Sequence, residues 1–372
     1  MNNITLVVLC AGNSTRFNSN TKKQWIRIED DPLWLYVTQN LSAIYDFSKI
    51  IVVGNGFELN YMSNFCDEYV LVAGGDQRQD SMKNALNHVE TDHVMITDVA
   101  RSCVPKDVIE SIISKKNEAD CIVPYLPVSD TVVFQNDTIN RDEVKLIQTP
   151  QLSRTNVIKK ALEQDIDFTD DSGAIKNIGG SVAYVLGSKD SAKITFGEEL
   201  DLLPCLKSPS NKFFTGGGFD IHPFEENKEM FLGGVKIDVD YGFKAHSDGD
   251  VLIHSVIDAL LGACGAGDIG EFFPDNDDKY KNIDSKVLLK EIVDFVNNVG
   301  YEIVNIDLTI IAQKPRVNKH KMTIKNSLSE LIGIKKQFIN IKATTAEKLG
   351  FIGRGEGVAV LSNATLKYFN WR

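Results

Sequence analysis

The sequence predicts an α/β chain that is divided into two domains. At 372 residues it is too long for a single hydrophobic core, because domains cluster at about 100 to 150 residues and rarely exceed about 250. Residues 204–212 contain two prolines and little apolar periodicity, which is typical of a linker, and the strand pattern begins afresh after them. We therefore expect a first domain over residues 1–203, a linker over 204–212 and a second domain over 213–372.

The first domain has the alternating pattern of a doubly wound sheet. Residues 4–9 form a continuous apolar run, which is typical of a strand buried on both faces. Similar runs at 50–53, 69–72 and 93–96 each end in a polar or glycine-rich cluster, and residues 106–116 carry one apolar helical face. Open α/β sheets bind their ligands beyond the carboxyl ends of the strands, so these clusters are the candidate site.

The loop after the first strand is suited to phosphate groups. Small residues at 10–15 let backbone N–H groups approach a phosphate, and Arg16 and Lys23 can neutralise a triphosphate. The loop matches neither the G-x-G-x-x-G nor the G-x-x-x-x-G-K-[ST] motif, which disfavours the dinucleotide-binding and P-loop classes. Taken alone, the loop is explained at least as well by an ordinary strand-to-helix turn.

Several polar segments follow this loop in a fixed order, at residues 74–81, 98–101, 130–131, 149–151, 169–171 and 193–195. Together with the loop they resemble the 2-C-methyl-D-erythritol 4-phosphate cytidylyltransferases over about residues 4–203. The resemblance implies a Rossmann-like nucleotidyltransferase domain that transfers CMP from CTP to methylerythritol phosphate. Such a reaction needs charge neutralisation and in-line placement more than acid–base help, so cations and Mg²⁺ or Mn²⁺ suffice.

The resemblance also implies roles for single residues. Arg16 and Lys23 would hold the CTP phosphates, and Asp98, with Asp190, would meet Mg²⁺. The remaining binding residues would be Gly12, Asp76 and Ser81 for the nucleotide, and Arg101, Thr131, Arg141, Thr169 and Lys193 for methylerythritol phosphate. The commoner roles of isolated residues of these types are helix capping and surface ion pairing.

This chain departs from the cytidylyltransferase pattern at four positions. Thr97 stands where a histidine is usual, Val99 for an alanine, and Ser102 and Lys22 for prolines. Two alternatives to the cytidylyltransferase hypothesis therefore stay open. The first domain could be a generic sugar-phosphate nucleotidyltransferase, or it could be a non-catalytic assembly domain.

In the second domain, three residues are candidate zinc ligands. Asp220 and His222 lie two apart, which turns both side chains to one side of a strand, and His254 begins an apolar helix. An aspartate and two histidines leave a fourth position open for a substrate oxygen, as in catalytic zinc sites. Asp258 shares a helical face with His254 and could orient it or cap an exposed turn.

Further segments accompany these ligands at residues 245–250, 267–275, 311–316 and 342–350. Together they resemble 2-C-methyl-D-erythritol 2,4-cyclodiphosphate synthase over about residues 213–370. The resemblance implies an α+β domain that cyclises 4-diphosphocytidyl-2-C-methyl-D-erythritol 2-phosphate and releases CMP. No protein nucleophile is needed, because metals activate the phosphorus and the pocket folds the substrate into a ring-closing pose.

By this resemblance Asp220, His222 and His254 bind Zn²⁺ or a similar divalent ion, and Glu347 binds a second divalent ion. The substrate-binding residues would be Asp268, Gly270 and Asp275 for the sugar, His246 and Ser247 for a phosphate, and Ala312, Lys314, Arg316, Thr344 and Thr345 for the cytidine part.

Composition limits the cellular setting. A net charge of −11 argues against a general nucleic-acid binder, which needs a broad basic face. The six cysteines form no C-x-x-C pair, so we expect reduced thiols rather than a zinc ribbon or a redox motif. No run approaches the ~20 apolar residues that span a bilayer. We therefore expect a cytoplasmic protein without a membrane segment.

The two resemblances imply different symmetries. Residues 124–152 would form the arm through which cytidylyltransferases dimerise, and Arg141 could reach a neighbour's site. Cyclodiphosphate synthases form trimers, with Arg354 and Glu356 near the threefold axis, so a hexamer is the smallest closed assembly that satisfies both. A kinase step separates the two reactions and no kinase motif is visible, which suggests a separate kinase partner.

Overall fold

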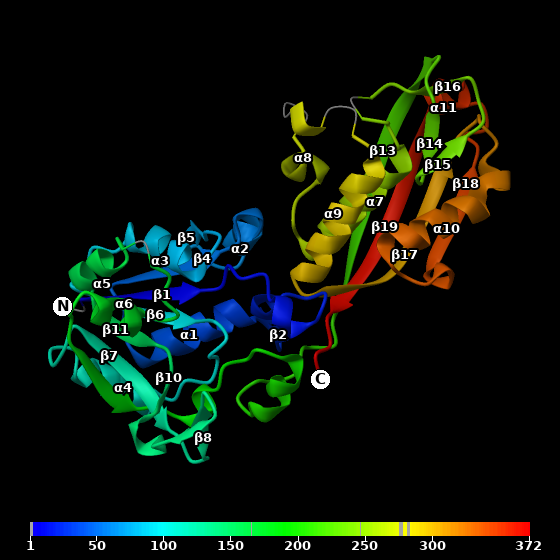
Figure 1. Cartoon of the computed structure of the whole chain (residues 1–372). Helices are drawn as coiled ribbons and strands as arrows, with labels where there is room; N and C mark the ends of the chain where they lie inside the picture. Colours follow the sequence, from blue (N-terminus) through cyan, green and yellow to red (C-terminus); the bar gives the residue numbers. More distant parts are fainter. Residues whose placement is uncertain (1–2, 165, 246, 275–277, 281–282) are drawn as a thin grey trace. The chain divides into compact units, whose positions relative to one another are not determined.

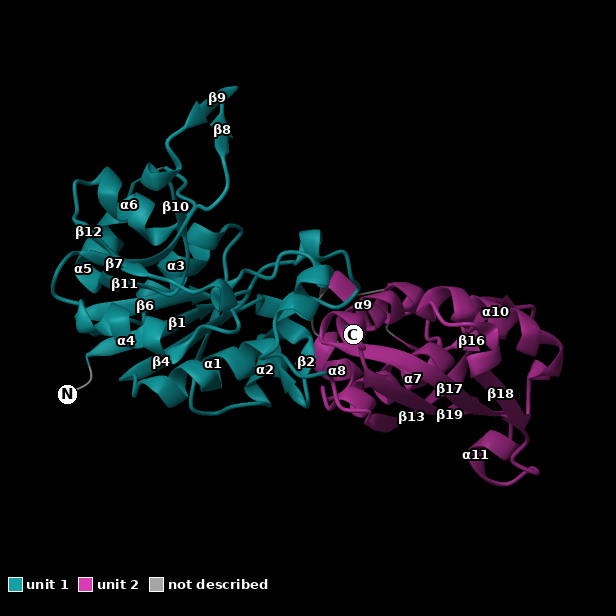
Figure 2. Ribbon diagram, turned by 90° about the horizontal axis from the view of Figure 1, so that it is seen from below, with its two compact units in different colours: residues 1–208, 371–372 teal, residues 209–370 magenta. Residues whose placement is uncertain are grey.

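The computed structural model describes residues 3–164, 166–245, 247–274, 278–280 and 283–372. The chain divides into two compact units, Met1–Ser208 with Trp371–Arg372 (unit 1) and Pro209–Asn370 (unit 2), as Figure 2 shows. Unit 1 is an α/β unit and unit 2 an α+β unit, which confirms the predicted fold class.

Unit 1 is built on an eight-stranded mixed sheet in the order β10-β7-β11-β6-β1-β4-β5, with β12 paired to β7. The strands are β1 (Ile4–Leu9), β4 (Lys49–Gly54), β5 (Val70–Ala73), β6 (His93–Asp98), β7 (Cys121–Pro127), β10 (Lys145–Ile147), β11 (Gln151–Arg154) and β12 (Val182–Leu186). β5, β4, β1 and β6 run parallel, whereas β11 is antiparallel to both β6 and β7.

Helices cover both faces of this sheet (Figure 1). They are α1 (Leu33–Ile44), α2 (Leu59–Ser63), α3 (Arg78–Leu86), α4 (Lys106–Ser114), α5 (Thr155–Ala161) and α6 (Asp171–Asn177). Every residue of β1 is buried, because Val7 and Leu9 pack into a cluster with α3, α5 and α6 while the intervening residues face the other layer. The continuous apolar run at 4–9 is thus buried on both faces, as predicted. β5 begins and ends one residue later than the expected strand 69–72, and α4 ends two residues before the expected helix 106–116.

The parallel strands bring the polar loops to one edge of the sheet. Cys10 N donates to the Val53 carbonyl, Gly74 N to the Gly54 carbonyl and Val99 N to the Leu9 carbonyl, each at 2.9 to 3.1 Å. These bonds continue the strand pairing into the first loop residues. The segments that follow β1, β4, β5 and β6 therefore meet where the sequence places the candidate site.

A hairpin extends from unit 1 (Figure 2). It consists of β8 (Val132–Phe134) and β9 (Asp137–Ile139), joined by Gln135 and Asn136 with φ of 50° and 69°, as a two-residue hairpin turn requires. Val133 and Phe134 are each 61% exposed. An additional short pair, β2 (Arg27–Ile28) and β3 (Asp31–Pro32), precedes α1.

Unit 2 is a five-stranded sheet in the order β16-β13-β19-β17-β18, covered by helices on one face. Its strands are β13 (Phe213–Glu226), β14 (Met230–Leu232), β15 (Val235–Ile237), β16 (Tyr241–Phe243), β17 (Tyr301–Ile311), β18 (Ile339–Thr344) and β19 (Gly357–Tyr368), of which β14 and β15 form a separate ribbon. Its helices are α7 (Val251–Cys264), α8 (Ile269–Phe272), α9 (Ser285–Asn298), α10 (Lys321–Ile332) and α11 (Gly350–Gly353).

The helix α7 lies directly against β13, and glycines permit this approach. A Cβ atom at Gly218 would lie 1.9 Å from the Ser255 carbonyl oxygen of α7. The opposite face of the sheet is open within one chain, where Phe219 is 58% and Leu361 45% exposed.

The end of unit 1 folds back onto its core. Cys103 and Cys205 are joined by a disulfide with their Cα atoms 6.1 Å apart, so the expectation of reduced thiols is wrong for this pair. The linker segment returns to the loop after β6, which brings together two cysteines that are 102 residues apart in sequence. The terminal residues also belong to this unit, since Trp371 Nε1 donates to the Arg27 carbonyl at 2.8 Å and Arg372 to the Leu206 carbonyl at 2.8 Å.

None of the helices in the described ranges combines the length and the apolar character that crossing a membrane requires.

Two neighbouring glycines test the packing of α7 on β13. Gly218→Ala should destabilise unit 2 by more than about 3 kcal/mol, because the new methyl group meets backbone that cannot move aside. Gly217→Ala is the matched control, since its Cβ would meet nothing closer than Asn363 Oδ1 at 3.8 Å. Thermal unfolding monitored by circular dichroism separates them. Equal melting temperatures for the two variants would contradict the described packing.

Candidate active sites

A cavity of about 550 Å³ opens at the carboxyl edge of the parallel strands in unit 1. Seven of the predicted site residues line it, namely Gly12, Arg16, Lys23, Asp76, Ser81, Asp98 and Lys193. They come from four separate segments of the chain. The sheet topology therefore brings together residues that the sequence analysis could group only by their order.

The first loop is fastened by its own side chains. Ser14 Oγ accepts a hydrogen bond from Lys23 N at 3.0 Å and donates to Gln24 Oε1 at 3.1 Å, while Gln24 Nε2 donates to the Gly12 carbonyl at 3.0 Å. Lys23 Nζ donates to the Ile194 carbonyl at 2.7 Å. Burial lowers the pKa of Lys23 to about 8, and the neighbouring Lys193 cation acts in the same direction. An anion in the cavity would relieve this repulsion.

Glu58 binds the residues on both sides of the Lys23–Gln24 pair, Lys22 and Trp25, a role that the sequence analysis missed. Its Oε1 lies 2.5 Å from Lys22 Nζ, and its Oε2 accepts a hydrogen bond from Trp25 Nε1 at 2.6 Å. The Glu58 side chain is only 3% exposed. Lys22, which replaces the usual proline, is thus a paired and nearly buried residue that flanks Lys23.

A second cavity of about 260 Å³ adjoins the first. It is lined by the predicted residues Asp98, Arg101, Thr169 and Lys193, together with Arg78, Ile147, Gln148, Thr149, Gln151 and Asp170. Arg78, Asp98 and Lys193 line both cavities. Two ligands, one in each cavity, would therefore meet at this shared wall.

Asp98 is paired with a cation on each oxygen. Arg78 Nε lies 3.0 Å from Oδ1, and Lys193 Nζ lies 2.7 Å from Oδ2. Burial alone would raise the pKa of Asp98, but the Arg78 and Lys193 cations lower it to about 2. The carboxylate is consequently charged at every physiological pH.

Arg78 is a second residue that the sequence analysis left without a role. Its Nη1 lies 3.0 Å from Oδ1 of Asp171, whose side chain is fully buried at the start of α6. Burial raises the pKa of Asp171 to about 6 despite the Arg78 charge. The only sequence signal was a basic residue inside the 74–81 segment, because its partner Asp171 is 93 positions away.

Three predicted residues are not among those that line either cavity. Thr131 and Arg141 are exposed in the arm, where Arg141 Nη1 donates to the Ser129 carbonyl at 2.6 Å. Asp190 is exposed on the short 3-10 helix Lys189–Ser191. Asp98 is therefore the one of the two expected magnesium ligands that lines the cavities, and the role of Asp190 stays a prediction.

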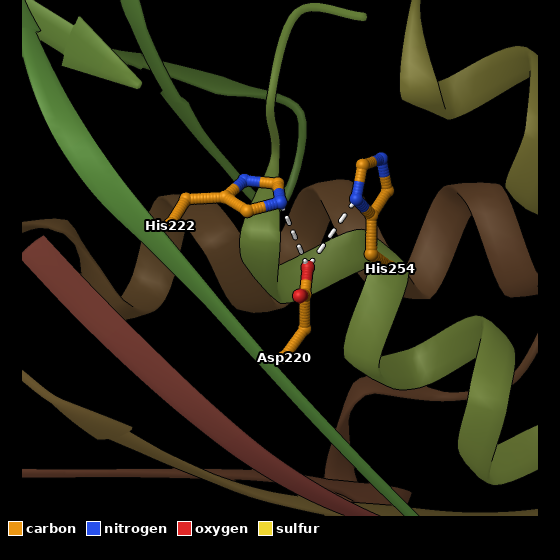
Figure 3. A group of neighbouring side chains, drawn as sticks. All are labelled: Asp220, His222 and His254. Atoms are coloured by element: carbon orange, nitrogen blue, oxygen red, sulfur yellow. Dashed lines mark ion pairs between the residues drawn. The ribbon is translucent and has the colours of Figure 1, made fainter. Parts of the chain in front are cut away.

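The predicted metal ligands of unit 2 converge on one point, as Figure 3 shows. Asp220 and His222 extend from β13, and His254 extends from the first turn of α7. Asp220 Oδ2 lies 3.3 Å from His222 Nε2 and 3.3 Å from His254 Nδ1. Among the described residues, this is the one cluster of three such side chains that could share a metal ion.

The donor set fits a divalent transition metal. Asp220 Oδ2 is buried and accepts no well-formed hydrogen bond, so a lone pair remains for an ion. Burial alone would raise the pKa of Asp220, but His254 and His222 outweigh it and lower the pKa below the usual range. One carboxylate oxygen and two imidazole nitrogens are typical ligands of a catalytic zinc ion with an open fourth position.

Near this cluster, Ser247 lies against a predicted metal ligand, whereas Asp258 and Asp268 accept hydrogen bonds from backbone N–H groups at the start of α8. Ser247, which the resemblance assigns to a phosphate, has its Oγ 3.5 Å from His254 Nε2 and so lies beside the cluster. Asp268 caps α8 by accepting from Gly270 N at 2.9 Å, and Asp258 Oδ1 accepts from Ile269 N at 2.9 Å. The capping interpretation of Asp258 is therefore the one that the geometry supports. His246 and Asp275 lie outside the described residues.

The segments predicted to bind cytidine contact each other. Ala312 N donates to the Thr344 carbonyl at 3.0 Å, and Thr345 Oγ1 donates to Glu347 Oε1 at 2.5 Å. Lys314 Nζ lies 4.9 Å from the ring centre of Tyr241. Arg316, Thr344, Thr345 and Glu347 are exposed, and Glu347 is not part of the cluster around Asp220.

Comparison with known proteins shows to which family the chain belongs. A family model described as 2-C-methyl-D-erythritol 4-phosphate cytidylyltransferase (IspD) matches residues 4–204, and the YgbB family model matches residues 213–367. A relative from Aliarcobacter butzleri, named bifunctional enzyme IspD/IspF, is 67% identical over 372 residues and covers 100% of both chains. The chain belongs to the bifunctional IspD/IspF family.

Other members of the IspD/IspF family agree with this assignment. A relative of the same name from Campylobacter fetus is 51% identical, covering 100% of this chain and 99% of its own. The solved structure of the bifunctional IspDF from Campylobacter jejuni has 49% identity and a TM-score of 0.88, covering 99% of each chain. The chain is thus an enzyme of the methylerythritol phosphate pathway with cytidylyltransferase and cyclodiphosphate synthase activities, as the two resemblances implied.

The Glu58 pairing can be tested by substitution. Glu58→Gln should lower the stability of unit 1 by about 1 to 3 kcal/mol and raise KM for CTP, because it leaves the Lys22 ammonium nearly buried without its anion. Adding Lys22→Met should restore most of the loss. The control is Glu90→Gln, since Glu90 forms only an exposed pair with Lys49 at 3.6 Å. If Glu58→Gln behaves like Glu90→Gln, Glu58 does not support the loop.

The lowered pKa of Lys23 predicts a pH dependence. As pH rises through about 8, the free enzyme loses the Lys23 charge, so kcat/KM for CTP should fall about tenfold per further pH unit. Lys23→Arg should remove this fall, whatever its absolute rate, because a guanidinium stays charged throughout. Initial rates of pyrophosphate release from pH 6.5 to 9.5 provide the test, and identical profiles for the two proteins would refute it.

Proposed function

We propose that unit 1 binds CTP in the larger cavity and methylerythritol phosphate in the smaller one, and that CMP is transferred at the wall they share. The observation that carries this proposal is the presence of Arg78, Asp98 and Lys193 in the lining of both cavities. A nucleotidyl transfer requires the attacking phosphate oxygen and the α-phosphorus to be held in line, and adjoining cavities provide that arrangement.

In this proposal the loop residues Gly12, Arg16 and Lys23 hold the triphosphate, and Asp76 and Ser81 face the cytosine. Ser81 is fixed for this role because its Oγ accepts from Gly75 N at 3.1 Å. Arg101 and Thr169 bind the acceptor phosphate or sugar. Arg101 is held by the Ser191 and Ile147 carbonyls, at 2.6 and 3.2 Å, rather than by a surface carboxylate.

A magnesium ion would enter with the nucleotide. Mg²⁺ commonly binds through one or two carboxylates together with substrate phosphates, and Asp98 is the carboxylate at the shared wall. Lys193, now on Asp98 Oδ2, would then be free to pair with the acceptor phosphate. Arg78 keeps Oδ1 and thereby the orientation of the carboxylate.

For unit 2 we propose that Asp220, His222 and His254 hold a zinc ion next to the diphosphate of the substrate. The ion supplies a Lewis acid that makes phosphorus more electrophilic. The 2-phosphate of the substrate attacks the diphosphate phosphorus that is attached to the sugar. The bond from this phosphorus to the oxygen that bridges to CMP breaks, and CMP leaves with that oxygen. The protein's part is to fold the substrate into this pose and to exclude water.

The cytidine-binding segments would complete the site from a neighbouring subunit, together with Glu347 and its second divalent ion. In support, Thr344, Thr345 and Glu347 are exposed, and Phe219 and Leu361 present exposed apolar side chains on the sheet. A trimer through this face and a dimer through the apolar β8–β9 hairpin would combine into a hexamer. Thr131 and Arg141 would act across the dimer.

The two reactions are not consecutive. The product of unit 1 lacks the 2-phosphate that attacks in unit 2, so a phosphorylation must intervene. We propose a separate cytoplasmic kinase as partner, and the cytoplasm, where CTP is made, as the location of this enzyme.

Two assays test the assignment. Incubation with CTP, Mg²⁺ and methylerythritol phosphate should release pyrophosphate, whereas other sugar phosphates should not, which separates this function from a generic nucleotidyltransferase. No release with any acceptor would support a non-catalytic first unit.

In unit 2, His222→Ala or His254→Ala should abolish CMP release and lower zinc content without affecting unit 1. The pyrophosphate assay on the same preparation is the internal control. Full cyclase activity in a zinc-free variant would rule out the metal site.

A further inference from the structure

The outer nitrogen of His254, Nε2, is held by side chains that are not themselves among the proposed metal ligands. His254 Nε2 lies 2.9 Å from Ser285 Oγ, at the start of α9. Ser285 Oγ lies 2.5 Å from Asp248 Oδ1, and Ser285 N donates to Asp248 Oδ2 at 3.2 Å. Ser285 is fully buried, so its hydroxyl is shielded from bulk water.

The direction of these hydrogen bonds follows from the donors available. A carboxylate can only accept, and a serine hydroxyl has a single proton. The 2.5 Å contact has the length of an O–H···O⁻ bond, so the hydroxyl proton points to Asp248. Ser285 Oγ then accepts from His254 Nε2–H. His254 Nδ1, on the side of Asp220, keeps its lone pair.

His222 also keeps an unprotonated nitrogen facing Asp220, but a backbone carbonyl rather than a side chain holds its other nitrogen. Its Nδ1 lies 2.9 Å from the Gly249 carbonyl, which can only accept, so Nδ1 carries the proton and Nε2 faces Asp220. Gly249 directly follows Asp248. A single turn before α7 therefore sets the proton position on both histidines, one through its backbone and the other through Ser285.

Ser247 is a weaker candidate for the same task. Its Oγ is 3.5 Å from His254 Nε2, beyond a good hydrogen bond, and it already accepts from Gly249 N at 3.1 Å. Ser285 at 2.9 Å is the better acceptor.

We propose that Ser285 and Asp248 form a positioning pair that fixes the tautomer and the ring orientation of His254 for metal binding. The inference rests on the proposed metal site of unit 2. Such outer partners typically contribute about 10- to 100-fold to metal affinity. The pair also links the start of α9 to the turn before α7, so a test must separate metal affinity from folding.

The first test is the zinc affinity of Ser285→Ala, measured by competition with a chromophoric chelator. We expect affinity about 10- to 100-fold weaker than in the unsubstituted protein. The matched control is Ser255→Ala. Ser255 is also a fully buried serine, next to His254 on α7, but its Oγ bonds to the Gly218 carbonyl at 3.1 Å and to Ser362 Oγ at 2.8 Å. This control should lower the melting temperature and leave zinc affinity unchanged.

The second test is Asp248→Asn, which preserves the shape of the side chain. The carboxylate now accepts from three donors, namely Ser285 N on Oδ2 and both Ser285 Oγ and Asp250 N on Oδ1. In either orientation the new amide NH₂ would face one of the two backbone N–H groups, so the hydrogen bonds that hold Ser285 should weaken. We expect zinc affinity to fall in the same direction as in Ser285→Ala, and an altered absorption spectrum of the Co²⁺-substituted protein.

The outcomes are distinct. Wild-type zinc affinity in a folded Ser285→Ala or Asp248→Asn protein overturns the positioning pair. Equal loss in Ser255→Ala overturns it too, because the effect would then be general to packing around α7. If the unsubstituted protein binds no zinc that His222→Ala removes, the proposed metal site itself fails. Circular dichroism of each variant shows whether it folds, and Asp248→Asn remains informative if Ser285→Ala does not.

Discussion

The ion pairs of Asp98 are the interaction on which unit 1 depends. A carboxylate between Arg78 and Lys193 is possible at this buried position because two cations offset its desolvation, and the same arrangement lowers its pKa to about 2. Arg78 also forms an ion pair with Asp171 at the start of α6. One network of ion pairs therefore joins the carboxyl end of β6, the 74–81 segment and α6. This network forms the wall between two cavities. Catalysis of nucleotidyl transfer at such a wall is a matter of position and charge rather than of a protein nucleophile.

Unit 2 uses a different constraint for related phosphorus chemistry. Two strand residues and one helix residue converge because α7 approaches β13 closely at Gly218, where no side chain fits. The converging atoms are one carboxylate oxygen and two imidazole nitrogens, a donor set that suits a borderline divalent ion such as zinc, whereas the site of unit 1 is rich in Lys and Arg side chains. The turn before α7 keeps the metal-facing nitrogens unprotonated. Packing and metal binding are therefore set by the same few residues.

Much of the fold and of both candidate sites could be predicted from the sequence, because the signals are local patterns or the order of motifs along the chain. The buried run at 4–9, the spacing of Asp220 and His222, and the apolar helix that carries His254 near its start all depend on nearest neighbours along the chain. Pairs between distant residues with ordinary local patterns could not be predicted. Arg78 with Asp171, Lys22 with Glu58, and Ser285 with Asp248 belong to this class, as does the Cys103–Cys205 disulfide. Asp190, which the resemblance pairs with Asp98 as a magnesium ligand, lies exposed on the 3-10 helix Lys189–Ser191, so its role stays a prediction.

The central claim is that donor and acceptor occupy two cavities that meet at Asp98. A crystal structure of the protein with CTP and Mg²⁺ tests it most directly. The account predicts cytosine beside Asp76 and Ser81, the α-phosphate at the wall formed by Asp98 and Lys193, and no part of the nucleotide beside Arg101 and Thr169. Phosphates bound around Arg101 and Thr169, with the larger cavity unfilled, would contradict it.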